Sequence, residues 1–102
     1  MHSTNREILK TLRGDILQFI YKSQVDRVKK TSIQSAFYAY YRYADIDRAI
    51  SYLVDRGFLE KEQLTSPIKN RSEDFYSISA DGMLIVDGTM SDKGIYMDTE
   101  DE

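Results

Sequence analysis

The clearest hydrophobic pattern in the chain lies in residues 42–60, which read RYADIDRAISYLVDRGFLE. Apolar residues recur there at i, i+3, i+4 and i+7, the spacing of one face of an α-helix; they are Ile46, Ala49, Ile50 and Leu53. Asp45 is a candidate N-cap because its carboxylate can accept from backbone amides, and Gly57 suits the left-handed conformation that ends many helices. The pattern therefore predicts a helix with both ends defined.

Two further helices are predicted before this one. A capping box at residues 4–7 precedes a helix over residues 5–22, whose apolar face holds Ile8, Leu9, Leu12, Ile16, Phe19 and Ile20. Gly14 lies inside it, so either the helix tolerates the glycine at a cost of up to ~1 kcal/mol or another backbone packs close there. A shorter helix is predicted over residues 32–41, with an apolar face of Ile33, Ala36, Phe37 and Tyr40.

The residues after Gly57 favour strands. Residues 58–64 and 74–79 predict a two-stranded ribbon, and the connection between them, residues 65–73, contains the only proline, Pro67. The apolar run in residues 80–88 fits either a strand or a short helix. Ser79 can cap such a helix and Gly88 can end it.

This order of elements resembles the winged helix-turn-helix superfamily of DNA-binding domains. The resemblance covers residues 5–88 and rests on the helix that ends in DRGFLE, on the ribbon and on YSISADG, residues 76–82. A later motif, DGTMSDKGI, is similar to the ending of small winged-helix proteins encoded in Mu-like prophages. The resemblance implies an α+β fold: a three-helix core, a two-stranded antiparallel wing and a short C-terminal helix.

Two details of chain organisation follow from the same resemblance. Val28 is expected in a one-bond strand that closes the ribbon, and the turn at Arg42 lacks the glycine that is usual in such turns. Residues 1–88 are expected to form the winged helix-turn-helix domain. Residues 89–102 are expected to form an acidic tail that is partly disordered.

Length and composition limit the classes of protein to which the chain can belong. A chain of 102 residues is long enough for one small domain. It has no cysteine and one histidine, His2, which excludes disulfides and Cys/His zinc sites. No apolar run approaches the roughly 20 residues that span a bilayer, and the N-terminus lacks the apolar region of a signal peptide. A cytoplasmic protein with no membrane partner is therefore expected.

The residues offer no catalytic arrangement. A hydrolase needs a nucleophile beside a base that a third group holds, and His2 is the only histidine. No glycine-rich loop is present to cradle a phosphate. The acidic residues within 98–102 lack the turn glycine and spacing of a calcium loop. The sequence thus indicates a protein that is not an enzyme and needs no cofactor or metal.

The distribution of charge changes what the net charge of −3 implies. Residues 1–72 hold 13 Lys and Arg against 8 Asp and Glu, whereas residues 73–102 hold 1 against 9. The acidity therefore belongs to the C-terminal third, and the first two thirds retain the positive charge that phosphate contacts need. The acidic end is either a solubilising tail or a tethered competitor for a basic surface.

In the resembling fold the third helix enters the major groove of DNA. The candidate contact residues on its outer face are Arg48, Ser51 and Tyr52, with Arg42 and Tyr43 at one end. Asp47 and Asp55 repel phosphate from that face unless they are paired. The alternative interpretation is a solvated helix face with mixed charges.

Two further candidate groups lie outside the third helix. Lys29 and Lys30 precede a helix start that contains Ser32, and free amides at a helix N-terminus favour a phosphate. The connection between the strands supplies Lys69, Asn70 and Arg71, which suit a phosphate or minor-groove contact. The alternatives are a plain basic loop and a plain turn.

The interpretation favoured by the sequence is a winged helix-turn-helix that binds double-stranded DNA. By resemblance it acts as a homodimer and as a transcriptional regulator of phage or bacterial origin. The alternative is a winged helix that serves as a protein–protein interaction module without DNA binding. The tyrosine-rich residues 37–43 also suggest stacking on single-stranded bases, but helical spacing favours Phe37 and Tyr40 as core residues, with Tyr38 and Tyr41 partly exposed.

Overall fold

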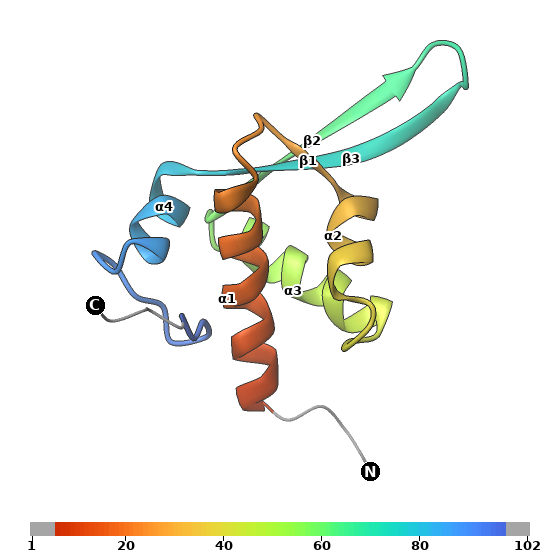
Figure 1. Ribbon diagram of the computed structural model, residues 1–102. Helices are drawn as coiled ribbons and strands as arrows, with labels where there is room; N and C mark the ends of the chain where they lie inside the picture. Colours follow the sequence, from red (N-terminus) through yellow and green to blue (C-terminus); the bar gives the residue numbers. More distant parts are fainter. Residues whose placement is uncertain (1–5, 98–102) are drawn as a thin grey trace.

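The computed structural model describes residues 6–97, which form a small α+β domain. Its elements in chain order are α1 (Arg6–Ser23), β1 (Val28–Lys29), α2 (Lys30–Phe37), α3 (Tyr43–Asp55), β2 (Leu59–Ser66), β3 (Arg71–Ile78) and α4 (Ala80–Val86). The three strands form an antiparallel sheet of order β1-β3-β2. The helices gather on one side, while the β2–β3 hairpin extends away from them (Figure 1).

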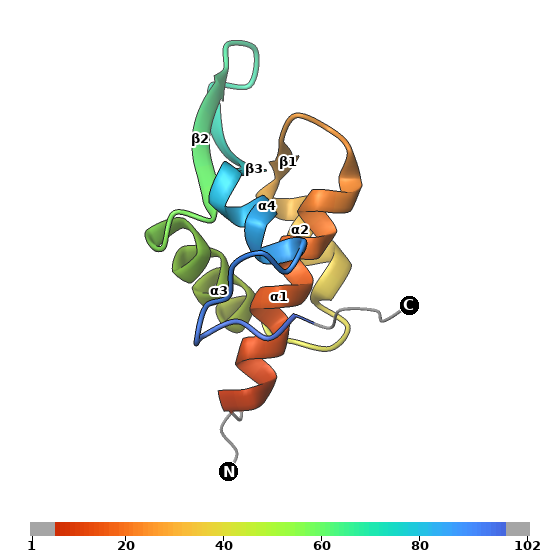
Figure 2. The ribbon, with the colours of Figure 1, turned by 90° about the vertical axis from the view of Figure 1, so that its left-hand side faces the viewer.

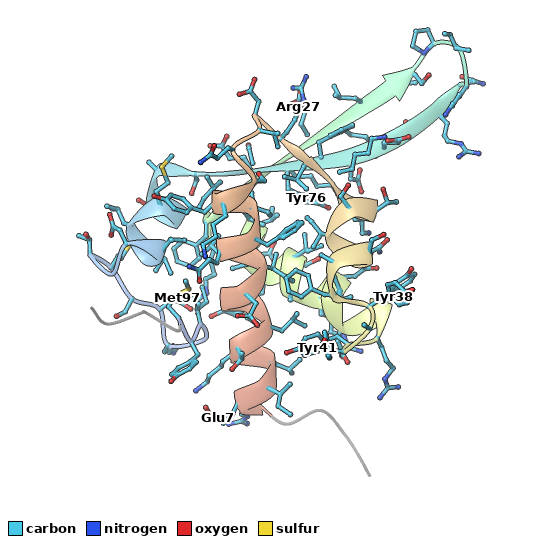
Figure 3. The ribbon with its side chains drawn as sticks, viewed as in Figure 1. Glu7, Arg27, Tyr38, Tyr41, Tyr76 and Met97 are labelled. Atoms are coloured by element: carbon cyan, nitrogen blue, oxygen red, sulfur yellow. The ribbon has the colours of Figure 1, made fainter. Side chains whose placement is uncertain are left out.

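The core lies where α1 and α3 pack together beneath the sheet. The apolar stripe predicted for α3 is confirmed, because all four of its residues are buried. Tyr76 of β3 lies beneath the sheet, between α1 and α2 in the view of Figure 3. The buried apolar residues are Leu12, Ile16, Leu17, Ile20, Val28, Ile33, Ile46, Ala49, Ile50, Leu53, Phe58, Leu59, Tyr76 and Ile85.

The start of α3 differs from the sequence-based prediction. Arg42 is the N-cap residue, and its carbonyl accepts from the amides of Asp45 and Ile46. Asp45 is therefore inside the first turn and buried, and its Oδ1 lies 3.5 Å from Nη1 of Arg48. The prediction that Asp45 caps the helix is wrong, whereas Gly57, with φ of +83°, does adopt the left-handed conformation expected after the helix.

The second helix is shorter than predicted. It ends at Phe37, and the amides of Tyr40 and Tyr41 both donate to the Phe37 carbonyl in a tight turn. This turn changes the register, so Tyr40 is 83 % exposed and was wrongly predicted to be in the core. Tyr41 packs against the core in its place, and Figure 3 shows Tyr38 on the outer side of α2.

The ribbon and the last helix agree with the predicted order. Val28 pairs with Tyr76, which confirms the short third strand. The hairpin strands are longer toward their connection than the sequence suggested, and only residues 67–70 lie between them. Residues 80–86 are a helix rather than a strand, and Ser79 Oγ caps it by accepting from the Gly82 amide at 3.0 Å.

Residues 89–97 differ most from expectation, because they pack on the helices instead of forming a tail. The Tyr96 amide donates to the Lys10 carbonyl in α1 at 3.1 Å. A Cβ at Gly14 would overlap the Tyr96 carbonyl, so this glycine is present because another backbone packs close to it. Met90, Ile95 and Met97 contact the core. The domain thus extends past the boundary expected at residue 88, while the capping box at residues 4–7 and the acidic residues 98–102 lie wholly or partly outside the described residues.

Candidate nucleic-acid interface

The tip of the β2–β3 hairpin is a defined loop. The Asn70 amide donates to the Ser66 carbonyl at 2.8 Å, and the Lys69 amide donates to Ser66 Oγ at 3.2 Å. Asn70 has φ of +52°, a left-handed conformation that asparagine adopts more readily than most residues. Just behind the loop, the hydroxyls of Thr65 and Ser72 lie 3.1 Å apart. These bonds hold the tip in one arrangement.

Charge divides the hairpin into two halves. Residues 63–72 contain Lys69 and Arg71 and no acidic residue. Both cations are exposed, and within residues 6–97 neither takes part in an ion pair. At the base of the hairpin, three of the four acidic residues are paired: Asp74 with Lys61 at 3.9 Å, Glu62 with Arg27 at 2.7 Å, and Glu73 with Lys29 at 3.6 Å; the fourth, Glu60, is exposed. The outer half is therefore positive and the base close to neutral.

A hollow of about 360 Å³ separates the hairpin from the start of α2. Lys29 and Lys30 line one side, and Arg71 lines the other, together with two carboxylates, Glu73 and Asp74. Lys30 Nζ lies 3.6 Å from Asp47 Oδ2. Ion pairs of this partly exposed kind contribute about 0–1 kcal/mol, so neither lysine is firmly held by its carboxylate. The hollow thus brings together three cations and two carboxylates.

The outer face of α3 carries mixed charge. Arg48 is outward, with its side chain 75 % exposed, as expected for a contact residue, and Ser51 is exposed on the same face. Asp47 lies between this face and Lys30, and its Oδ1 accepts from Gln34 Nε2 at 2.9 Å. The positive surface that runs from Arg71 to Lys30 is consequently interrupted before it reaches Arg48.

The start of α3 forms an exposed end of the molecule. Arg42 and Tyr43 are both exposed there. The ring of Tyr43 meets that of Tyr38 edge to face, with centroids 6.2 Å apart. Tyr40 projects from the same turn. This end therefore combines one cation with three accessible aromatic rings.

Tyr52 was expected beside Arg48 on the outer face of α3, but it is half-buried against residues 89–97. Its hydroxyl donates to Asp92 Oδ2 at 2.6 Å, and the Arg13 guanidinium stacks on its ring at 4.1 Å. Burial raises the pKa of the Tyr52 hydroxyl, and the hydrogen bond to Asp92 raises it further. Tyr52 thus anchors residues 89–97. Sequence reasoning missed this role because those residues were taken for a tail.

The structure brings only some of the predicted contact residues together. Lys29, Lys30 and Arg71 surround the hollow, and Ser32 is exposed in the first turn of α2. Lys69 and Asn70 lie at the hairpin tip. Figure 2 shows the hairpin and α3 on the same side of the molecule. One surface can therefore present the hairpin and α3 to a single partner.

Sequence reasoning also overlooked Ile68. This residue stands in the polar turn between Pro67 and Lys69, and it is 93 % exposed. The available signal was an isolated apolar residue within a stretch of turn-forming and basic residues.

No family model matches the chain, and no curated protein matches it. Among residues 6–97, no helix is long and apolar enough to cross a bilayer. The same residues contain no group of three or more His, Asp or Glu side chains arranged to hold a metal ion.

Proposed function

We propose that this domain is a winged helix-turn-helix that binds double-stranded DNA, with the β2–β3 hairpin as its wing. The observation that carries the proposal is the outer half of the hairpin: ten residues, 63–72, hold no acidic residue and two cations that form no ion pair with any residue in 6–97. They lie on the same side as α3 (Figure 2). The order of the helices supports the same assignment, and so does the pairing of the short strand β1 with β3, next to the wing.

In this proposal the wing and α3 contact different parts of the duplex. The major groove is about 12 Å wide and admits a helix, so α3 presents Arg48 and Ser51 to base edges there. Arg42 contacts phosphate at the start of α3. Lys69 and Arg71 reach the adjacent backbone or minor groove. Lys29 and Lys30 supply phosphate contacts near the start of α2, where the N-cap residue offers no side-chain acceptor to the free amides.

The biological role in this proposal is transcriptional regulation in a phage or a bacterium. A homodimer would place two copies of α3 on neighbouring half-sites about one helical turn apart, roughly 34–36 Å. Cytoplasmic localisation belongs to the same proposal, because the DNA target lies there.

A specific observation favours a second candidate function, a protein–protein interaction module. Asp47 and Asp55 place negative charge on α3 and interrupt the positive surface. The exposed rings of Tyr38, Tyr40 and Tyr43 form the kind of aromatic surface that is enriched at protein interfaces. In this alternative the partner binds the end of the molecule formed by the α2–α3 turn.

The test compares salt dependence of binding to a short duplex for the full chain and two double variants. One variant carries Lys69→Ala and Arg71→Ala in the wing. The matched control carries Lys22→Ala and Lys93→Ala, which remove the same charge from exposed positions outside the interface. We expect the wing variant to lower the slope of log affinity against log salt by about 2, roughly one per phosphate contact, and the control to leave it unchanged.

Two outcomes would contradict DNA binding through the wing. One is an equal slope for the wing variant and the control. The other is the absence of any duplex binding at low salt, about 50 mM, where phosphate contacts are strongest. Either result would favour the protein-interaction candidate.

A further inference from the structure

Ile68 is the most exposed large apolar side chain in residues 6–97. Single exposed apolar residues are common on protein surfaces. The position of this one is unusual, because it lies at the far end of a long hairpin, where no neighbouring element can cover it (Figure 1). Its side chain is therefore accessible to a partner that contacts the tip of the hairpin.

The loop presents Ile68 on a stiff support. Strands β2 and β3 pair continuously from Leu59 with Ile78 to Ser66 with Arg71. Pro67 fixes its own φ angle, and the two hydrogen bonds to Ser66 close the loop behind Ile68. A rigid tip loses little conformational entropy when its side chain is inserted into a partner.

The residues that follow Ile68 have the chemistry of a minor-groove contact. Lys69 and Arg71 provide positive charge, and Asn70 provides an amide that can hydrogen-bond to base edges. Architectural proteins combine such side chains with an apolar wedge that enters between base steps and kinks the duplex by about 20–90°. Isoleucine and proline are among the residue types used as wedges.

We infer that Ile68 is an apolar wedge that inserts between base pairs of the bound duplex and bends it. This inference rests on the proposed DNA-binding function and adds to it the deformation of the DNA partner. Lys69 and Arg71 hold the tip against the two phosphate backbones while Ile68 replaces a base–base contact. The domain therefore favours DNA sites that unstack easily, such as mismatched pairs or flexible pyrimidine–purine steps.

An anionic membrane is the other surface that fits an apolar tip with two cations. A single isoleucine is a small anchor, since even a whole myristoyl chain gives only marginal membrane binding. The location of the tip on the same side as α3 also favours a duplex, which can contact both elements at once. DNA is therefore the partner to test first, and binding to anionic vesicles is measured for comparison.

The experiment measures affinity of the full chain for two short duplexes that differ only in a central two-base mismatch. The mismatch lowers the cost of unstacking at a known place. We expect the natural protein to prefer the mismatched duplex by roughly tenfold or more, because unstacking one step costs a few kcal/mol and 1.4 kcal/mol is a factor of 10. Ile68→Ala and Ile68→Ser are expected to reduce that preference to near one.

A matched control and two spectroscopic readouts complete the design. Val25→Ser removes another exposed apolar side chain, from the loop between α1 and β1, and is expected to keep the full preference. Energy transfer between dyes at the duplex ends reports bending, and 2-aminopurine beside the mismatch reports unstacking. We expect both signals with the natural protein and neither signal with Ile68→Ala. Thermal melting should show all three variants folded, because the substituted side chains are exposed.

The outcomes separate failure of the wedge from failure of DNA binding. If Ile68→Ala binds both duplexes as the natural protein does and bends them equally, the wedge is overturned while DNA binding stands. If no variant binds any duplex at low salt, the proposed function fails and the wedge fails with it. Binding to phosphatidylglycerol vesicles that depends on Ile68, without duplex binding, would assign the tip to a membrane and overturn the inference.

Discussion

The hydroxyl of Tyr52 in α3 donates a hydrogen bond of 2.6 Å to Oδ2 of Asp92, forty residues further along the chain. The same oxygen accepts from the Gly94 amide at 2.9 Å, and Nη1 of Arg56 lies 3.6 Å from Oδ1. Arg13 Nη1 donates to the Gly94 carbonyl at 2.8 Å. Residues 89–97 are therefore tied to α3 through the nearly buried Asp92 carboxylate and to α1 through the Gly94 carbonyl.

Protonation of Asp92 is expected to destabilise the fold in acid. Burial alone would raise the pKa of Asp92, but the hydrogen bonds from Tyr52 and Gly94 and the charge of Arg56 outweigh it and lower the pKa from its usual 3.8. A carboxyl with a lowered folded-state pKa contributes stability that is present above its unfolded-state pKa and lost as the pH falls through the folded-state value. The free energy of unfolding should therefore decrease as the pH falls below about 4.

The Asp92→Asn variant isolates this contribution. Asparagine has a similar shape but no charge, so we expect a loss of about 1 to 3 kcal/mol at pH 7. The difference between the natural protein and the variant should shrink as the pH falls below 4. Urea unfolding at a series of pH values measures both quantities, and a difference that is constant with pH would show that Asp92 does not titrate as proposed.

Gly14→Ala tests the close approach of residues 89–97 to α1. Alanine is the better helix former by about 1 kcal/mol, yet its Cβ would overlap the Tyr96 carbonyl. We expect a net destabilisation of about 1 to 3 kcal/mol, as in other overpacked positions, and faster tryptic cleavage after Lys93 as the segment is displaced. Ser35→Ala on the exposed side of α2 is the control, and a Gly14→Ala protein as stable as that control would mean that no backbone packs there.

Two substitutions in α3 distinguish its buried and outer faces. Leu53→Ala is expected to lower the free energy of unfolding by about 2 to 5 kcal/mol, because Leu53 is fully buried and its removal leaves a cavity. Arg48→Ala should change it by less than about 0.5 kcal/mol, because Arg48 is exposed and its contact with Asp45 is long. Thermal and urea denaturation would reject the assignment of faces if the two losses were similar.

The sequence correctly predicted the features that depend on interactions between residues close together in the chain. The stripe of α3, the left-handed Gly57 and the Ser79 cap each depend on residues within one or two turns, so periodicity and turn chemistry were sufficient. The end of α2 could not be predicted in this way. Its tyrosines fit a longer helix by spacing alone, and only the tight turn after Phe37 places Tyr40 in solvent.

Long-range contacts explain the errors at the candidate interface. Tyr52 was assigned to the outer face of α3 because its partners, Arg13 and Asp92, are distant in sequence. The glycines at positions 14 and 94 are a sign of that packing in the sequence. A Cβ at Gly14 would overlap the Tyr96 carbonyl, and a Cβ at Gly94 would overlap the Tyr52 side chain. Ion pairs such as that of Lys30 with Asp47 also depend on how α2 meets α3, so net charge along the chain did not reveal them.

The last prediction concerns Asp47, which interrupts the positive surface between the hollow and α3. Asp47→Asn removes the negative charge beside Lys30 while retaining an amide oxygen that can accept from Gln34. If Lys30 contacts phosphate in competition with Asp47, we expect duplex affinity to rise several-fold at low salt and the slope of log affinity against log salt to steepen by up to about 1, because the ammonium then neutralises its phosphate without a competing carboxylate. Asp55→Asn is the matched control, since it makes the same change in net charge at the exposed end of α3. The control should raise affinity slightly without a change of slope, and fluorescence anisotropy titrations at several salt concentrations measure both. Identical slopes for the two variants would place Lys30 outside the DNA contact and leave the wing as the principal source of affinity.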